Sequence, residues 1–408
     1  MSHTPARSTH HGAALYLAVV QFLFVTCWTV YVIYLPGMLD SAGLPRRYAP
    51  WILVLDQLVF MAMDVMTGMA ADRTARVVGR IGPLIVGITA ASCVAFLLIP
   101  HAAGAGAWAS ISLLTLVLIW TATSSALRAP PWVLLSRYAA APALPWLNAL
   151  SLTGLGIGAA AAPYLGIALK DVDPRLPFAI SSLALLATTA GLVWAERAIS
   201  AQASTTPPPA AKPAALGATA WLFMAGCVLL AAGFQVHVSL NSAGQYLRFA
   251  PAGQLQYLMP VFWAGFSVAM FPGAALANRY GTLPVIAGAA VLGAGGALAG
   301  ALAPSLEVLV AAQLVAGGAW GCVLMATFTA AIELGRTGRE GLALGAFFAI
   351  LAAATLARIA AVVTELHKQP GIAPVLAWTP LVLWLAAGAL FAVLAAKMPA
   401  ARRVTGDE

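Results

Sequence analysis

Apolar segments of about 20 residues follow one another along almost the whole chain, separated by short polar stretches. A helix of that length crosses the hydrocarbon core of a bilayer, because it bonds its own backbone N–H and C=O groups. Twelve such segments can be marked in the 408 residues, at 12–35, 49–71, 81–100, 107–137, 144–169, 174–196, 216–246, 255–277, 282–302, 305–332, 341–365 and 373–397. The sequence therefore predicts an all-α, polytopic membrane protein with twelve transmembrane helices.

The composition excludes most other classes of protein. Hydrophobic residues make up 62% of the chain and charged residues only 8%, whereas soluble domains are about a quarter charged. Nucleic-acid binding is not expected, because the net charge of +8 forms no basic patch. The four cysteines lie inside apolar segments without metal-ligand spacing, so we expect apolar filler, no metal site and no cofactor.

The middle of the chain divides the apolar segments into two sets of six. Residues 204–209 read Ser-Thr-Thr-Pro-Pro-Pro, which is typical of a linker. We therefore expect two pseudo-symmetric six-helix bundles. Their predicted bounds are 1–196 and 216–397, with a cytoplasmic linker at 197–215 and a cytoplasmic tail at 398–408.

Lys and Arg residues are unevenly distributed between the two ends of the predicted helices. If the N-terminus is inside, the cytoplasmic loops and ends carry most of them, among them Arg73, Arg76, Arg80, Arg336 and Arg339. The positive-inside rule then places both termini and the linker in the cytoplasm. We expect a multi-pass protein of the cell inner membrane.

A short motif recurs about half the chain apart. Residues 68–73 read Gly-Met-Ala-Ala-Asp-Arg after the second segment, and 274–279 read Ala-Ala-Leu-Ala-Asn-Arg after the eighth. Two repeated halves are the arrangement that alternating-access transporters use. The first motif resembles the signature of the major facilitator superfamily, whose layout of six plus six helices with a central cytoplasmic loop fits the whole chain.

This resemblance implies a gating role for the motif. In that family the Asp and the Arg pair with neighbouring helix ends and lock the outward-facing state. The implied gating residues here are Asp72 and Arg73, with Asn278 and Arg279 as a second copy. Asn278 carries no charge, so the second copy is expected to be the weaker latch.

The longer run from Asp64 to Pro83 is similar to the glycoside–pentoside–hexuronide:cation symporter branch of that superfamily. The similarity implies that Asp64 is a cation-coupling acid. Phe60 stands where that branch has a second acid, and Val65 where it has proline. A sodium site built on paired acids is therefore not expected, whereas a proton needs only one carboxylate.

A fragment in the fifth segment, Gly158-x-x-x-x-Pro163-x-x-Gly166, resembles the Gly–Pro element of proton-coupled antiporters. The alternative is that these small residues serve close helix packing. The resemblance points to efflux, whereas the packing interpretation gives the fragment a purely structural role.

Four ionisable residues stand out inside predicted membrane segments: Asp56, Asp64, Arg128 and Arg358. A charge there costs several kcal/mol, so each is a candidate functional residue, and the two acids, Asp64 and Asp56, are the candidate proton-coupling residues. From the helical rise, Asp64 and Arg128 both lie about 12–13 Å from the cytoplasmic end. We predict that they pair, or that Arg128 binds an anionic substrate while Asp64 carries a proton. A static salt bridge between two helices is the alternative.

The other two charges and one proline pair carry further expectations. Asp56 and Arg358 lie near the outer ends of segments that face each other in this superfamily, so they form either an outer gate or two side chains that snorkel to the interface. Pro130 and Pro131 directly follow Arg128, and we expect them to kink or break the fourth helix.

Polar residues on the first, second and seventh segments are candidates for the wall of a substrate cavity, since a polar stripe facing lipid is costly. The i+4 spacing of 237, 241 and 245 places these residues on one helix face. His237 is either a titrating group or a neutral, hydrogen-bonded structural residue. The candidate substrate-binding residues are Gln21, Tyr31, Gln57, Arg128, Gln235, His237, Asn241 and Arg358.

Together these features favour a monomeric secondary active transporter, surrounded by membrane lipid, that moves a small organic solute with protons rather than sodium. One arginine in each half favours an anionic or zwitterionic solute. The alternative in the same class is a multisubstrate drug:proton antiporter. A membrane enzyme or a receptor is not favoured, because the sequence has neither a catalytic cluster nor an appended soluble domain.

Overall fold

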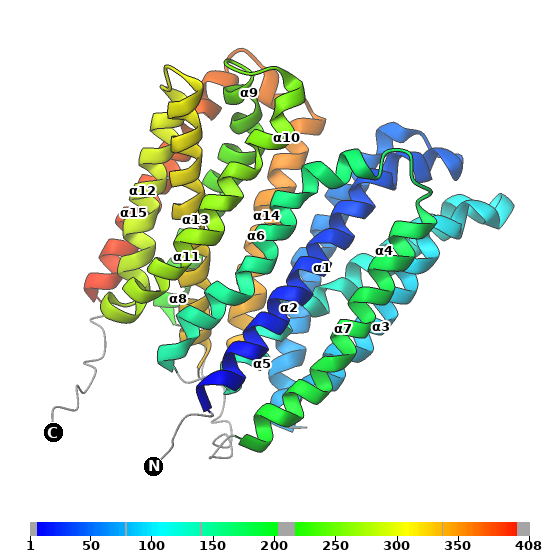
Figure 1. Ribbon diagram of the computed structural model, residues 1–408, viewed down its shortest axis with the longest axis horizontal. Helices are drawn as coiled ribbons and strands as arrows, with labels where there is room; N and C mark the ends of the chain where they lie inside the picture. Colours follow the sequence, from blue (N-terminus) through cyan, green and yellow to red (C-terminus); the bar gives the residue numbers. More distant parts are fainter. Residues whose placement is uncertain (1–5, 78–79, 139–140, 203–216, 337, 398–408) are drawn as a thin grey trace. The chain divides into compact units, whose positions relative to one another are not determined.

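The computed structural model describes residues 6–77, 80–138, 141–202, 217–336 and 338–397, and these residues contain helices and turns but no strand. The helices are α1 Ala6–Ser41, α2 Ala49–Val77, α3 Gly82–Leu98, α4 Ala109–Ser124, α5 Ala129–Tyr138, α6 Leu144–Ala168, α7 Arg175–Gln202, α8 Ala218–Gln235, α9 Ser242–Tyr246, α10 Leu255–Leu258, α11 Pro260–Tyr280, α12 Thr282–Ala301, α13 Leu306–Gly335, α14 Glu340–Val363 and α15 Ala373–Lys397. Figure 1 labels them along the chain.

Eleven of the twelve predicted segments form helices long and apolar enough to cross a membrane within the described part of the chain. The remaining one, predicted at 174–196, is the helix α7. The predicted all-α architecture with twelve membrane helices is therefore confirmed. Several helices continue beyond the apolar segments that predict them; α2, for example, ends at Val77 instead of residue 71.

Two further predictions concern residues at the edges of the described ranges. The first part of the predicted linker, 197–202, belongs to α7. Residues 203–215 of the linker and the tail 398–408 lie outside the described residues. Packing divides the chain into unit 1, with α1–α7, the end of α13 and α14, and unit 2, with α8–α12, most of α13 and α15.

The packing of α14 on α2 in unit 1 brings the two backbones into contact. A Cβ atom added at Gly68 would overlap the carbonyl oxygen of Gly341, and one added at Gly345 would overlap the carbonyl oxygen of Asp64. Only glycine allows so close an approach at these positions. This contact places α14 along the face of α2 that carries Asp64.

The rest of unit 1 consists of α1 packed on α6 and α7, and α3 packed on α4 and α7. An aromatic cluster fills the space between α1, α3 and α4. The ring of Trp120 lies 4.6 Å from that of Tyr31 and 5.0 Å from that of Phe96, measured between centroids. These rings are buried, so they support the polar residues beside them.

In unit 2, α15 packs on α12 and α8. Trp384 of α15 is buried, and its Nε1 donates to the carbonyl oxygen of Leu230 at 3.0 Å. Trp320 of α13 stacks on Phe234 of α8 with 4.2 Å between ring centroids. Pairing of the indole N–H is the expected arrangement for a buried tryptophan.

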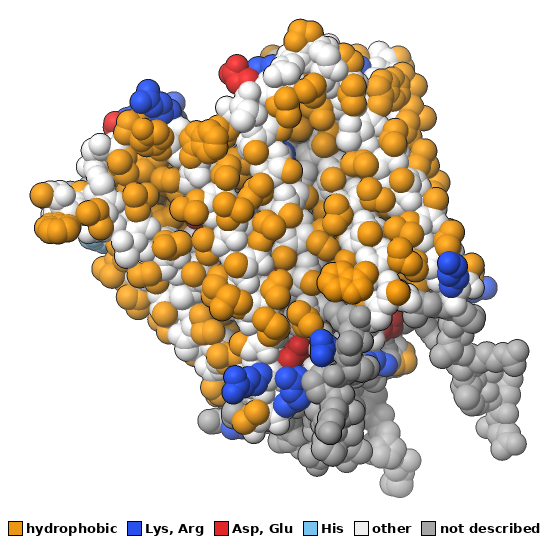
Figure 2. All heavy atoms as spheres, turned by 180° about the vertical axis from the view of Figure 1, so that it is seen from behind, with side chains coloured by type: hydrophobic (Ala, Val, Ile, Leu, Met, Phe, Trp, Pro, Cys, Tyr) orange, Lys and Arg blue, Asp and Glu red, His pale blue; other side chains and the backbone are white. Residues whose placement is uncertain are grey.

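The surface follows the membrane pattern. On the face drawn in Figure 2, hydrophobic side chains cover the middle of the helices, and Lys, Arg, Asp and Glu gather near the helix ends. Exposed apolar residues of this kind include Trp51, Ile111, Trp221 and Val268. A soluble protein does not expose so much contiguous apolar surface, whereas a bilayer requires it.

Candidate functional site

The fourth membrane segment is broken where the sequence predicts it. The helix α4 ends at Ser124, a 3-10 turn covers Ser125–Leu127, and α5 begins at Ala129. Arg128 between them has φ −93° and ψ −86°, which is outside the helical region. Pro130 and Pro131 cause the break, because a proline has no N–H to donate and its ring crowds the preceding turn.

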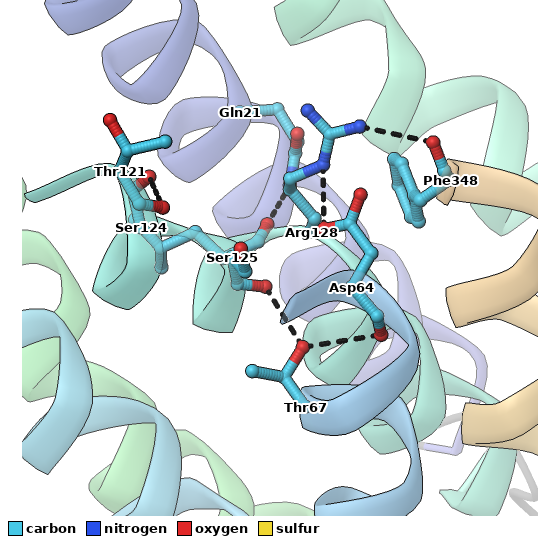
Figure 3. A network of polar contacts seen from close by, with 9 residues as sticks. Gln21, Asp64, Thr67, Thr121, Ser124, Ser125, Arg128 and Phe348 are labelled. Carbon is cyan, nitrogen blue, oxygen red and sulfur yellow. Dashed lines mark hydrogen bonds and ion pairs between the residues drawn. The ribbon is translucent and has the colours of Figure 1, made fainter. Parts of the chain in front are cut away.

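Side chains from two other helices bond the carbonyl groups of the broken turn (Figure 3). The Nε2 atom of Gln21 on α1 donates to the carbonyl oxygen of Leu127 at 3.0 Å. The hydroxyl of Thr67 on α2 donates to the carbonyl oxygen of Ser125 at 3.5 Å, a long bond, and to that of Asp64 at 3.3 Å. Gln21, predicted to bind substrate, therefore bonds the backbone of the break.

Asp64 and Arg128 meet at this break. The Nε atom of Arg128 lies 2.9 Å from Oδ1 of Asp64; the Asp64 side chain is fully buried and that of Arg128 is 15% exposed. The structure thus brings the two residues together, as the pairing alternative predicts. Whether the pair couples transport or only joins two helices stays a prediction.

The remaining contacts of Arg128 are to α2 and α14. Its guanidinium carbon lies 4.7 Å from the centre of the Phe60 ring and 5.0 Å from that of Phe348. Its Nη2 atom donates to the carbonyl oxygen of Phe348 at 3.3 Å, which is the hydrogen bond of the guanidinium to a carbonyl among the described residues. Phe60, at the place of an acid in the symporter branch, thus gives the arginine an aromatic face instead of a second carboxylate.

Asp56, the other acid of α2, is enclosed by neutral donors. It accepts hydrogen bonds from Tyr31 at 2.9 Å and from Thr121 at 2.8 Å, and it is 2% exposed. It therefore does not snorkel to the interface. No ion pair joins it to Arg358 within the described residues, and the buried Nε atom of Arg358 has no hydrogen-bond partner there. The outer gate pair stays a prediction.

Asp72 bonds the N-terminus of α14. Its Oδ1 accepts from the N–H of Gly341 at 2.7 Å and its Oδ2 from the N–H of Leu342 at 2.9 Å. A carboxylate in this position satisfies free amides and interacts favourably with the helix dipole. The structure thus gives Asp72 the helix-end contact that the resemblance implies, while its gating role stays a prediction.

The arginine beside this contact is not the expected one. Arg73 is exposed and makes no hydrogen bond or ion pair among the described residues. Arg76, one turn later, donates from Nη1 to the carbonyl oxygen of Gly338 at 2.7 Å, just before α14. In the second copy, Asn278 and Arg279 make no hydrogen bond within the described part of unit 2, where Arg279 lies over the Tyr280 ring.

Unit 2 contains a chain of polar side chains in which His237 and Gln313 are buried and Gln245 is half-buried. Nε2 of His237 lies 3.0 Å from Oε1 of Gln313, and Nε2 of Gln313 donates to Oε1 of Gln245 at 3.0 Å. Asn241 instead donates to the carbonyl oxygen of Leu376 at 2.9 Å. A π-helical turn covers Val236–Asn241, and Asn241 thus has a different partner from His237 and Gln245.

Two other predicted residues, Gln235 and Gln57, lie away from the ion pair's own hydrogen bonds. Gln235 accepts from the hydroxyl of Ser239 at 3.3 Å, and Gln57 is buried on α2. Sequence reasoning missed Gln313 and also Glu196, which is buried and accepts from the N–H groups of Ile81 and Gly82 at the start of α3, at 2.8 and 2.9 Å. Their signal is a lone polar residue in or at the end of an apolar segment.

A cavity of about 470 Å³ lies in unit 1 at the C-terminal end of α1. It is lined by Tyr34, Asp40, Arg46, Asp173 and Arg175 among others, and by none of the predicted site residues. No group of three or more His, Cys, Asp or Glu side chains that could hold a metal ion occurs within the described residues.

Comparison with known proteins rests on three-dimensional structure. No protein-family model matches the sequence, and no curated protein matches it. A bacterial homologue of the iron transporter ferroportin, in an outward-facing state, has 15% identity and a TM-score of 0.73, with 94% of this chain and 99% of that chain covered. The E. coli fucose:proton symporter FucP, a Major Facilitator Superfamily transporter in the outward conformation, has 14% identity and a TM-score of 0.68, with coverages of 95% and 99%.

The chain has the major facilitator fold. A third structure, the human organic anion transporter MFSD10, agrees, with 14% identity, a TM-score of 0.65 and coverages of 96% and 99%. At such identities the likeness establishes the fold and selects no branch within it. The twelve-helix layout in two bundles predicted from the sequence fits the major facilitator fold, and the solved structures that share it here are transporters rather than enzymes.

Proposed function

We propose that this protein is a secondary active transporter that moves a small anionic or zwitterionic organic solute together with protons. The observation that carries the proposal is the buried Asp64–Arg128 pair inside the membrane segments. Groups of this kind are costly to bury and are retained where an ion or substrate pathway needs them. The names of the similar structures, a fucose:proton symporter and an organic anion transporter among them, agree with this class.

Charge balance gives the pair a coupling mechanism. With Asp64 ionised, the carboxylate and the guanidinium neutralise each other. If a proton binds Asp64 and a solute anion binds Arg128, the site again has no net charge, because one positive and one negative charge have entered together. Either ligand alone leaves an uncompensated charge in a low-dielectric site, which is strongly unfavourable. Proton and anion therefore bind together.

The hydrogen-bonding capacity that Arg128 has left supports an anionic substrate. Among the described residues, the hydrogen bond that holds the end of the guanidinium is the one from Nη2 to a single carbonyl group. A carboxylate is the group that a guanidinium binds best, since two parallel N–H···O bonds can form. An uncharged solute could accept a hydrogen bond from this edge of the guanidinium but would bring no charge to balance a proton on Asp64.

The link from Arg128 to α14 connects the pair to a conformational change. Arg128 donates to the Phe348 carbonyl of α14, and the amides at the N-terminus of α14 are held by Asp72. We expect solute and proton binding at the pair to weaken the first of these contacts. Alternating access then requires α14 to separate from α2. In this proposal the protein lies in the cell inner membrane, and both termini and the end of α2 that carries Asp72 face the cytoplasm.

The test uses purified protein in liposomes with an imposed pH gradient and a panel of small carboxylates, amino acids, sugars and lipophilic cations. We expect accumulation of at least one carboxylate or zwitterion, and its loss when the gradient is collapsed. Gradient-independent uptake of every member of the panel would contradict proton coupling. Proton-driven movement of lipophilic cations without dependence on Arg128 would instead identify a drug antiporter.

The coupling role of Asp64 is tested with the accumulated solute. Asparagine keeps the size of the side chain but cannot carry a proton, so Asp64→Asn should retain solute exchange without a gradient and lose accumulation driven by the gradient. Asp171→Asn, at an exposed acid in a loop, is the matched control and should behave as the unmodified protein does. Full accumulation by Asp64→Asn would leave the salt bridge as a purely structural feature.

No specific observation favours efflux. Gly154, just before the Gly–Pro element of α6, lies against α1 so closely that an added Cβ would overlap the carbonyl oxygen of Ala18. Gly158 faces Val25 of the same helix. These contacts are the close helix packing that the sequence leaves open as the alternative interpretation of this fragment.

A further inference from the structure

We propose that Gln21 is a positioning residue whose side-chain amide replaces the backbone N–H that Pro131 lacks, and thereby sets where Arg128 lies relative to Asp64. This inference about structure does not require the proposed transport function. Only its consequence for coupling rests on that function.

The replacement follows from helix geometry. In an uninterrupted helix the N–H of residue 131 would donate to the carbonyl oxygen four residues earlier, which is that of Leu127. Proline at 131 has no N–H, so this carbonyl oxygen loses its donor. The Nε2 atom of Gln21 occupies the vacated position at 3.0 Å, and the side chain is buried.

The carbonyl group that Gln21 bonds lies directly before Arg128 in the chain. Leu127 is followed directly by Arg128, whose φ and ψ depart from helical values. On the other side of the turn, Thr67 donates to the Ser125 carbonyl, as does the Arg128 N–H at 3.1 Å. Gln21 from α1 and Thr67 from α2 thus bond the two ends of the 3-10 turn (Figure 3). The conformation of this turn sets the direction of the Arg128 side chain.

This arrangement changes the role expected for Gln21. A side chain whose donor is bonded to a buried carbonyl cannot donate that hydrogen bond to a solute without leaving the carbonyl unsatisfied. Buried carbonyl groups are almost always paired. Gln21 therefore acts through Arg128, and its effect should depend on Pro131.

The experiment measures the protonation of Asp64 without any substrate. Infrared difference spectra of the full-length protein in liposomes, recorded across a pH series, report the protonated carboxyl band, which Asp64→Asn assigns. Arg128→Leu provides the titration of Asp64 without its partner. We expect Gln21→Leu to move the midpoint by about half or more of the way from the unmodified protein towards Arg128→Leu, because the pair is strongly coupled.

The dependence on Pro131 is tested by a double-mutant cycle. Pro131→Ala supplies an N–H for the Leu127 carbonyl, so in that background Gln21→Leu should have about half its effect or less. Thr29→Val, which removes a hydroxyl bonded within α1 to the Val25 carbonyl at 2.9 Å, is the matched control and should not move the midpoint. Thermal unfolding confirms that each variant is folded.

Two results would overturn the inference. One is an unchanged Asp64 midpoint in folded Gln21→Leu protein. The other is an effect of Gln21→Leu that is equally large with alanine at 131. Neither result depends on the transport assay, so a failure of the proposed function is recognised separately, by the absence of proton-driven accumulation in the unmodified protein.

Discussion

At Arg128 a single side chain serves several neighbours at once. Its Nε atom pairs with Asp64, its Nη2 atom donates to the Phe348 carbonyl, and the Phe60 and Phe348 rings pack against it. A guanidinium provides separate donors in fixed directions, whereas an ammonium is one compact, strongly hydrated charge. The identity of this residue therefore matters as well as its charge.

We expect Arg128→Lys to lower the initial rate of proton-driven uptake by about tenfold or more, since lysine cannot keep both contacts. The measurement is uptake into liposomes of the solute found in the panel. Arg175→Lys, an exposed arginine in a loop-proximal position, is the matched control and should leave the rate unchanged. Equal rates for Arg128→Lys and the unmodified protein would show that charge alone suffices.

The residue scale also shows what a sequence can predict. The similar depth of Asp64 and Arg128 follows from the helical rise, and the pair forms. The choice of Arg76 over Arg73 depends on the rotation of α2 relative to α14, which the sequence does not show. Likewise, Pro131 identifies the orphaned carbonyl group, but only the tertiary structure shows that Gln21 reaches it.

Between elements, α2 and α14 approach each other backbone to backbone. Gly68 and Gly341 each lie where a Cβ atom would overlap the carbonyl oxygen of the other, so even a methyl group must separate the helices. Backbones in such contact gain dispersion energy along the whole crossing, and helices in membranes associate mainly through packing of this kind.

We expect Gly341→Ala to destabilise the protein by about 1–3 kcal/mol, the range for overpacking a close contact. Gly288→Ala, at a position on α12 with no neighbouring atom within 4 Å, is the matched control. It should be neutral or stabilising by up to about 1 kcal/mol, because alanine is the better helix former. Thermal unfolding in detergent measures both. A Gly341→Ala protein as stable as the control would contradict the contact.

At the scale of elements, the sequence predicts where helices form and break better than it predicts which residues they contact. The break at Pro130 and Pro131 is local chemistry and is confirmed. The π-helical turn that separates Asn241 from His237 and Gln245 has no such signal, because the i+4 spacing assumes a regular helix. The burial of His237 against Gln313 agrees with the structural alternative for that histidine.

For the molecule as a whole, apolar segment length is enough to predict the twelve-helix layout, and the solved structures agree with it. The grouping of α14 with α1–α7 is not apparent from the sequence, which places this segment in the second half of the chain. That grouping depends on backbone contacts between residues far apart in sequence. The orientation in the membrane is a separate prediction, made from Lys and Arg alone.

Orientation is tested by labelling single introduced cysteines with a membrane-impermeant maleimide in intact cells. We expect Asp171→Cys and Gly371→Cys to be labelled from outside, and Arg279→Cys to be labelled only after the membrane is opened; all three positions are exposed. The chain without introduced cysteines is the control, since its own four cysteines lie in membrane segments. The reverse pattern would invert the proposed topology.

The contacts between α2 and α14 follow one another in antiparallel order. Asp72 bonds Gly341 and Leu342, Gly68 touches Gly341, Asp64 touches Gly345, and Arg128 beside Asp64 bonds Phe348. Hydrogen bonds thus join this interface at two places: at the N-terminus of α14 through Asp72, and beside the buried ion pair through Arg128. In the proposed transport cycle, binding of proton and solute at the ion pair would leave the bonds of Asp72 to α14 in place, so that both contacts must open before the helices separate.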